Sequence, residues 1–220
     1  FFNRLIQNMI AANNVNPNRI YVMGYSAGGD GVYQLAPRMA DRFAAAAMMA
    51  GHPNDANPLS MRNIAFAIHM GENDSLYNRN RVAIEWGKKL NKLKKNDPDG
   101  FEYQIKIYKG KGHDISNVKI KGVLGEQRVG LDSLGISWLS KFSRDPYPKK
   151  VIWKQDDVVH NRFYWLKVNQ PQKNSLIVAS IDNQIITIEE TTVNHIVIRV
   201  NDNILDMDKK VIVKYLGNNI

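Results

Sequence analysis

Residues 20–29 read IYVMGYSAGG, in which a short apolar run leads into a glycine-rich turn around Ser26. The run is typical of a buried strand, and the residues after the turn have helical character. A strand, then Gly-x-Ser-x-Gly, then a helix is the context of a nucleophile elbow, in which small residues let a sharp turn lift the serine Oγ above the sheet. The alternative is a strand-to-helix turn in which Ser26 only caps the helix. The flanking elements favour the nucleophile.

A nucleophilic serine at neutral pH needs a base and an acid that orients the base. In this architecture the acid and then the histidine follow the serine, each on a loop after a strand. The apolar run at 64–70 ends in GEND, and the alternating run at 101–108 ends in KGKGH. We therefore predict Asp74 as the acid, with Glu72 in reserve, and His113 as the base.

The other histidines carry weaker signals. His52 follows the apolar run at 44–50 and is a candidate for lining a substrate pocket. His69 lies inside an apolar strand and is interpreted as a core residue with satisfied hydrogen bonds. His160 and His195 lie in the C-terminal part of the chain. No HExxH pattern or tight cluster of histidines and carboxylates is present in the sequence, so we predict neither a metal nor another cofactor.

Residues 1–144 alternate between helical and strand patterns, which predicts an α/β domain with a parallel sheet covered on both faces. After RDPYP at 144–148 the pattern changes to short β-branched segments separated by turns, which predicts a small all-β, sandwich-like accessory domain over 145–220. The expected helices are 3–13, 28–43, 79–95 and 126–142, and the expected strands are 19–23, 44–50, 64–70, 101–108 and, in the all-β part, 151–153, 163–168, 175–181, 184–189, 195–200 and 211–216.

Composition narrows the classes of function. The net charge is +9, and the excess lies within residues 1–150. The lysines of residues 88–95 are typical of a solvated helix face, with an anionic partner as the lesser alternative. No nucleic-acid-binding motif is present, and no apolar run has the length of a membrane span. The sequence contains no cysteine, which excludes disulfides and thiolate chemistry.

Three stretches of the sequence resemble members of the α/β-hydrolase superfamily: IYVMGYSAGGDGVYQLAPRMADRFAAAAMMAGHP, HMGENDSLYNRN and YKGKGHDI. They are most similar to bacterial esterases related to polyhydroxybutyrate depolymerases and feruloyl esterases. The resemblance implies that Ser26 attacks an acyl carbon, that His113 moves the proton and that the Ala27 amide supplies an oxyanion donor. It also implies that Tyr25 and Gly29 line the elbow. Arg79 would either anchor the acid loop or form a surface salt bridge.

The resemblance also implies a longer enzyme. An α/β-hydrolase sheet has several strands before the elbow strand, whereas one helical pattern precedes it here, so we expect about four early strands and the loop with the second oxyanion donor to lie outside this segment. Enzymes of that branch are often exported, which implies a periplasmic or extracellular location.

The leading hypothesis is a serine esterase that acts on a small or polymeric ester through an acyl-enzyme. Within the same superfamily the alternative is a serine peptidase. A different class is a non-catalytic protein whose all-β part contacts polysaccharide or a partner. The aromatic residues considered for that contact, for which core packing is the favoured interpretation, are Trp153, Phe163, Tyr164 and Trp165.

Overall fold

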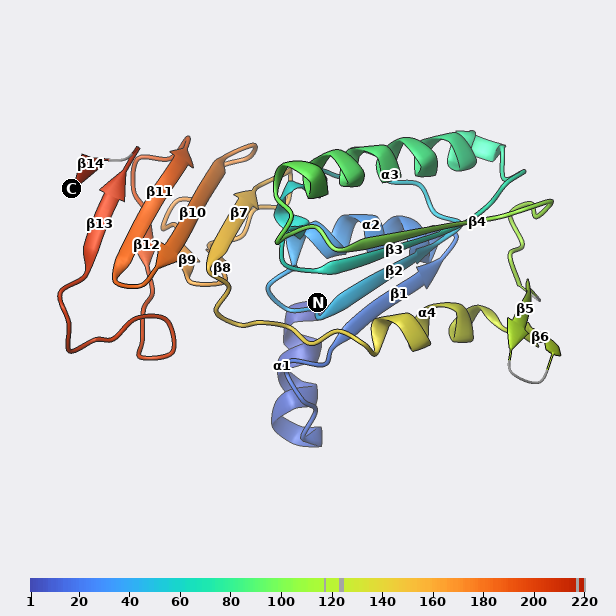
Figure 1. Cartoon of the computed structure of the whole chain (residues 1–220), viewed down its shortest axis with the longest axis horizontal. Helices are drawn as coiled ribbons and strands as arrows, with labels where there is room; N and C mark the ends of the chain where they lie inside the picture. The colour runs from blue at the N-terminus through green and yellow to red at the C-terminus, as the bar shows by residue number, and fades with distance from the viewer. Residues whose placement is uncertain (117, 123–124, 217, 220) are drawn as a thin grey trace.

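A four-stranded parallel sheet carries the predicted site residues. The computed structural model describes residues 1–116, 118–122, 125–216 and 218–219. The strand order of the sheet is β1-β2-β3-β4 (Figure 1). The strands are β1 (Tyr21–Tyr25), β2 (Ala45–Met49), β3 (Ala65–Gly71) and β4 (Tyr103–Tyr108). Every residue of β2 and β3 is buried, as expected for parallel strands that are covered on both faces.

Helices cover both faces of this sheet. On one face, Tyr33 of α2 (Ala27–Arg38) and Trp86 of α3 (Arg79–Asn96) pack with Phe66 in one apolar cluster. On the other face, Leu139 of α4 (Leu131–Leu139) packs with the alanines of β2 and β3. The remaining helical elements are α1 (Phe2–Asn13), which buries only Ile6, and two 3-10 turns, η1 (Pro58–Met61) and η2 (Leu76–Asn78).

The amphipathic pattern at 79–95 is confirmed. Trp86 and Leu90 are buried in α3, whereas Lys88 and Lys89 are exposed. These lysines therefore lie on an exposed face of α3, as expected for a solvated helix face. After α3, a turn at residues 97–100 leads into the amino end of β4, and Pro98 and Asp99 on this turn are exposed.

The pattern over 28–43 predicts a helix that is interrupted or kinked near Pro37, and this is confirmed: α2 ends at Arg38, directly after Pro37. Another helix differs from the expectation. The helix expected over 126–142 is shorter and begins at residue 131. The first residues of the expected helix instead lie in β6 (Gly125–Val129), which pairs antiparallel with β5 (Val118–Gly122). The apolar periodicity of a helix starts only after Gly130, and the polar run before it has none.

The C-terminal segment adds two further sheets beyond the amino ends of β1–β4 (Figure 1). The five-stranded sheet has the order β14-β13-β11-β10-β7, and the three-stranded sheet has the order β12-β9-β8. The strands are β7 (Lys150–Lys154), β8 (Arg162–Phe163), β9 (Leu166–Lys167), β10 (Leu176–Asp182), β11 (Ile185–Thr191), β12 (Val197–Ile198), β13 (Ile212–Tyr215) and β14 (Asn218–Asn219).

The run FYWLKV at 163–168 is not one strand. Phe163 pairs with Leu166, so Tyr164 and Trp165 form the turn of a hairpin, with Tyr164 in the left-handed region at φ 52°. Both turn side chains point into the protein. The Tyr164 hydroxyl donates to the Ala40 carbonyl at 2.8 Å, and the Trp165 indole N–H donates to the Pro148 carbonyl at 2.8 Å. These two buried contacts explain why a strand-like sequence turns here.

One apolar cluster runs from the parallel sheet into the C-terminal sheets. Trp153 stacks on Phe163 with ring centroids 5.7 Å apart, and both side chains belong to the same cluster as Phe66 and Trp86. Arg38 on α2 reaches across to Asp156 at 2.6 Å. The two parts of the chain thus share buried surface. Within the described ranges, no helix is both long enough and apolar enough to cross a bilayer.

Candidate active site

Ser26 stands in a strained turn between β1 and α2. Its backbone has φ 56° and ψ −122°, a conformation that costs a non-glycine residue energy and persists where the surroundings impose it. The Ser26 N–H donates to the Met49 carbonyl at 2.9 Å, which ties the turn to β2. Gly24 and Gly28 flank it, and a Cβ on Gly24 would overlap the Gly28 carbonyl oxygen. The tight turn therefore depends on the absence of a side chain at position 24.

Ser26, His113 and Asp74 lie in a hydrogen-bonded line. Ser26 Oγ is 2.9 Å from His113 Nε2, and His113 Nδ1 is 2.8 Å from Asp74 Oδ2. The residues come from the loops after β1, β4 and β3, whose carboxyl ends meet at one edge of the sheet. The Ser26 side chain forms no capping bond to α2, which contradicts the alternative that it serves only as a helix cap. Chemically, the arrangement allows a proton to pass from Oγ to the imidazole.

Asp74 is buried and has two neighbours that carry donors. Its side chain is 1% exposed, and Oδ1 lies 3.8 Å from Arg79 Nη1 while Oδ2 faces His113. Arg79 is itself buried at the start of α3, and its guanidinium lies over the Tyr77 ring, 4.8 Å from the centroid. Because Arg79 is buried beside Asp74, it fits the expectation of a residue that anchors the loop of Asp74 and does not form a surface salt bridge.

Glu72, the reserve acid, faces a different partner. Its Oε2 accepts a hydrogen bond from the Gly110 N–H at 2.8 Å, and the residue is exposed. Asp74, not Glu72, thus lies against the imidazole.

Tyr25 and Ala27 lie directly beside Ser26. The Tyr25 hydroxyl donates to the His113 carbonyl at 3.2 Å, and the two rings lie 5.2 Å apart at their centroids. Burial, with the nearby carboxylates of Asp114 and Asp74, raises the pKa of the Tyr25 hydroxyl, which keeps it a donor. Ala27 is the first residue of α2, where backbone N–H groups have no partner within the helix and face its amino end. That position suits an oxyanion donor.

Gly29 and His52 are tied into the scaffold around the elbow. A Cβ on Gly29 would lie 2.6 Å from the Met49 carbonyl oxygen, so glycine allows α2 to pack closely on β2. The His52 N–H donates to Asp30 Oδ1 at 2.6 Å, and its Nδ1 contacts Asn54. Their contact with substrate stays a prediction. Asp30, which sequence reasoning did not select, stands in the first turn of α2, a position where acidic residues are favoured.

His69 differs from its expected role as a fully satisfied core residue. It is completely buried in β3, and Nδ1 lies 2.7 Å from the Tyr108 hydroxyl oxygen. Nε2 is buried and has no partner among the described residues. Burial, assisted by the charge of Lys106, lowers the pKa of His69 to about 4, so the ring is neutral at pH 7.

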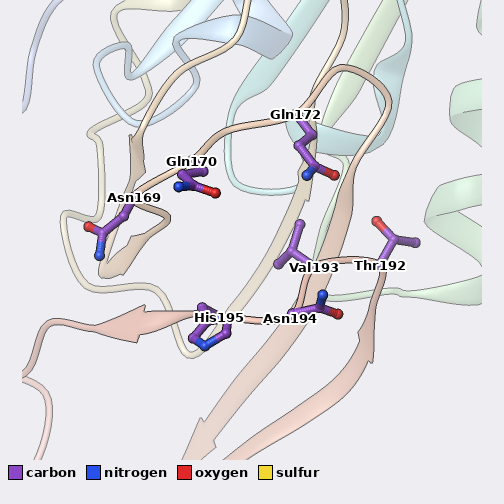
Figure 2. A pocket seen from close by; sticks show the side chains of 7 residues that line it. All are labelled: Asn169, Gln170, Gln172, Thr192, Val193, Asn194 and His195. Atoms are coloured by element: carbon purple, nitrogen blue, oxygen red, sulfur yellow. The ribbon is translucent and has the colours of Figure 1, made fainter.

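The aromatic residues considered for polysaccharide contact are all buried, with exposed fractions of 1% to 8%. Polysaccharide contact through these four rings is therefore wrong, and core packing is confirmed for Trp153, Phe163, Tyr164 and Trp165. The C-terminal part does contain a cavity of about 340 Å³, between the segment 169–172 and the segment 192–195 (Figure 2). Its lining is amide-rich and has no carboxylate, lysine or arginine side chain.

Comparisons with known proteins identify the family of this chain. No curated protein matches it. Solved structures that resemble it include esterase PE8 (18% identity, 52% of this chain and 52% of that chain, TM-score 0.38). A thermostable esterase (21%, 65% and 36%, TM-score 0.40) and Arabidopsis thaliana SOBER1 (20%, 51% and 53%, TM-score 0.35) resemble it as well. The chain spans about half of the first of these proteins and about a third of the second. The model of the Dienelactone hydrolase family matches residues 2–126, more than half of the chain, so the chain belongs to that family and to the α/β-hydrolase superfamily.

Proposed function

We propose that this chain carries the catalytic residues of a serine hydrolase that cleaves carboxylic esters. One observation carries the proposal: Ser26 Oγ, the His113 imidazole and the Asp74 carboxylate are joined by hydrogen bonds of 2.9 and 2.8 Å. Membership of the Dienelactone hydrolase family supports ester hydrolysis as the reaction.

Acylation begins when Ser26 Oγ attacks the acyl carbon and its proton passes to His113 Nε2. Asp74, which accepts from His113 Nδ1, orients the ring and stabilises the imidazolium that forms. The tetrahedral intermediate collapses when the C–O bond to the leaving group breaks and His113 returns the proton to the leaving alcohol. An acyl-Ser26 ester remains. A water molecule then attacks it with His113 as the base, and the carboxylic acid and free Ser26 are released.

The oxyanion of each tetrahedral intermediate would accept a hydrogen bond from the Ala27 N–H. The amino end of α2 adds a partial positive charge at the same place. The His113 side chain is 38% exposed, which leaves room for a substrate beside Nε2.

Labelling with a fluorophosphonate probe tests the nucleophile. We expect the wild-type protein and a Ser140→Ala control, in which an exposed serine is changed, to be labelled equally. Ser26→Ala should lose all labelling. Labelling that persists in Ser26→Ala would remove Ser26 from the mechanism.

A substrate panel separates esters from amides. We expect turnover of p-nitrophenyl esters and none of dipeptide amides; the reverse result would favour the peptidase alternative. A hydroxybutyrate oligomer and a methyl ferulate ester in the same panel test the resemblance to depolymerases and feruloyl esterases.

We also propose that the C-terminal sheets bind a neutral carbohydrate, through the cavity of Figure 2 rather than through aromatic rings. Among the described residues, no hydrogen bond is formed by the side chains of Asn169, Gln170, Gln172, Asn194 or His195. Amides both donate and accept, which matches the hydroxyl groups of a sugar, and the absence of charged lining residues matches a neutral ligand. Val193 offers an apolar surface to the C–H face of a sugar ring.

Affinity electrophoresis in gels that contain soluble xylan or hydroxyethyl cellulose tests this second proposal. We expect at least one gel to retard the wild-type protein and a Lys173→Ala control, since Lys173 is exposed next to the cavity but does not line it. The double variant Gln170→Ala with Asn194→Ala should migrate as in a gel without polysaccharide. Wild-type migration that neither polysaccharide changes, or retardation that survives in the double variant, would contradict carbohydrate binding at this cavity.

A further inference from the structure

Two loops supply the base and the acid of the proposed site, and the start of the acid loop lies against the histidine loop. The acid loop comprises residues 72–78 after β3, and the histidine loop comprises residues 109–113 after β4. The strands end opposite each other, with Gly71 paired to Tyr108. Asp74 lies two residues beyond the start of the acid loop, and His113 ends the histidine loop. Their 2.8 Å contact therefore depends on how the loops are held together.

Two backbone hydrogen bonds join the acid loop to the end of β4 and to the histidine loop. The Glu72 N–H donates to the Tyr108 carbonyl at 3.1 Å, and the Asn73 N–H donates to the Lys111 carbonyl at 2.8 Å. Gly71 has no space for a side chain, because a Cβ there would overlap the Gly112 carbonyl oxygen. The loops are thus in direct backbone contact just before Asp74 and just before His113.

The Glu72 carboxylate adds a third connection at the apex of the histidine loop. Oε2 accepts from the Gly110 N–H at 2.8 Å. Gly110 has φ 69°, a left-handed conformation that glycine adopts without steric cost. The bond therefore favours one conformation of a loop that glycine otherwise leaves free to vary.

The acid loop also holds Glu72 itself in place. Asn80 at the start of α3 donates from Nδ2 to the Glu72 carbonyl at 2.8 Å, and its own N–H donates to the Asp74 carbonyl at 3.0 Å. The backbone at Glu72 and Asp74 is thus bonded to the start of α3, and the Glu72 side chain projects from it towards Gly110 of the histidine loop.

The geometry points to Glu72 as a positioning residue that holds His113 in line between Ser26 and Asp74. The inference rests on the proposed function, because it assigns Glu72 a role in presenting the base of that reaction. Glu72 acts through the Gly110 N–H and touches neither substrate nor the reacting atoms. A displacement of about 1 Å in such a site can cost on the order of a hundredfold in rate, so a loop contact of this kind has a measurable effect.

Three variants test the assignment by kinetics with p-nitrophenyl acetate, with rates expressed per site titrated by fluorophosphonate. We expect Glu72→Ala to lower kcat about tenfold with little change in KM, because the base is misplaced while the substrate site stays intact. Glu72→Gln retains an oxygen that accepts from Gly110 and should stay within about twofold of wild type. Glu85→Ala is the matched control, since Glu85 is an exposed glutamate paired with Lys88 on α3.

Hydrogen exchange at the Gly110 amide reads the contact without relying on activity. We expect faster exchange in Glu72→Ala and exchange near the wild-type rate in both Glu72→Gln and Glu85→Ala. Unchanged Gly110 exchange in Glu72→Ala, or a kcat for it equal to that of Glu85→Ala, would overturn the assignment. A Glu72→Gln variant as slow as Glu72→Ala would also overturn it, because the charge rather than the hydrogen bond would then matter. A wild-type protein that the probe does not label would instead contradict the proposed function, and Gly110 exchange would still decide the contact.

Discussion

A methyl group on Gly24 would overlap the carbonyl oxygen of Gly28, whereas a methyl group on Gly28 would meet no atom within 4 Å. The two glycines of the Gly-x-Ser-x-Gly pattern are therefore unequal. The close approach forces glycine at the end of β1, while the second glycine lies in the first turn of α2 with open space around its Cα.

We expect Gly24→Ala to destabilise the protein by about 1–3 kcal/mol, the usual cost of overpacking a fixed site, and to displace Ser26. Its esterase rate should fall on the order of a hundredfold. Gly28→Ala should change the free energy of unfolding by less than about 1 kcal/mol, because its side chain meets open space and alanine favours a helix. Urea denaturation and p-nitrophenyl ester turnover measure both effects, and equal losses in the two variants would contradict this account.

Arg79 beside Asp74 gives a second prediction. Arg79→Met keeps most of the buried stem but removes the charge that lies 3.8 Å from the Asp74 carboxylate. Without this partner the buried Asp74 carboxylate is held less firmly in line with His113, so we expect kcat/KM to fall about tenfold. Arg81→Met, an exposed change on the same helix, is the control. If both variants retain wild-type kcat/KM, Arg79 does not act on Asp74.

The Tyr164 hydroxyl, which donates to the Ala40 carbonyl 124 residues away, provides a third prediction. Tyr164→Phe leaves a buried carbonyl without its partner and should lower the free energy of unfolding by about 1–3 kcal/mol. Tyr147→Phe, in which the hydroxyl belongs to a partly exposed ring, should change it by less than about 0.5 kcal/mol.

Because one apolar cluster spans both parts of the chain, we expect fluorescence and enzymatic activity to be lost in one transition during denaturation. Separate transitions would instead favour independent domains at 1–144 and 145–220.

His69 predicts a dependence of stability on pH. Burial lowers its pKa from 6.5 to about 4 in the folded protein. Between these values the unfolded chain binds a proton that the folded protein does not, so the free energy of unfolding falls as the pH drops from 6.5 towards 4. The full loss is about 3 kcal/mol. Well above pH 6.5 His69 is neutral in both the folded and the unfolded chain, so it no longer makes the free energy of unfolding depend on pH.

Urea titrations at a series of pH values measure this dependence. His69→Gln should flatten the slope between pH 6.5 and 4, whereas His195→Gln, a change at an exposed histidine, should retain it. An unchanged slope in His69→Gln would show that other groups cause the loss of stability in acid.

The sequence predicted the parallel sheet well because its strands are short apolar runs that end in glycine, as at Gly24 and Gly71. The sequence also predicted Ser26, Asp74 and His113 on loops that each follow a strand, and the structure brings them within hydrogen-bond distance. Their catalytic roles remain predictions. The sequence predicted Asp74 ahead of Glu72 as the acid, and in the structure Asp74 contacts His113 while Glu72 contacts Gly110. The role of Glu72 at Gly110 depends on the register of two loops, which no local pattern contains.

The errors arose where distant contacts decide local structure. FYWLKV has the composition of one strand, yet Tyr164 and Trp165 turn inward to carbonyls of Ala40 and Pro148. The same two aromatic side chains were candidates for a binding surface, and composition cannot distinguish a buried ring from an exposed one. Residues 126–129 were predicted as the start of a helix, whereas they lie in β6 and pair with β5, because their own apolar signal is weak.

The turn at residues 97–100 has a practical consequence. It joins α3 to the amino end of β4, whereas Ser26, Asp74 and His113 lie at the carboxyl ends of their strands. Arg62 fixes the first residue of the turn with bonds of 2.7 and 2.8 Å to Asp97, while Pro98 and Asp99 are exposed. A peptide tag or a fluorescent reporter inserted between Pro98 and Asp99 would thus be carried on the side of the sheet remote from Ser26, and would allow the protein to be immobilised with Ser26 and His113 facing away from the support.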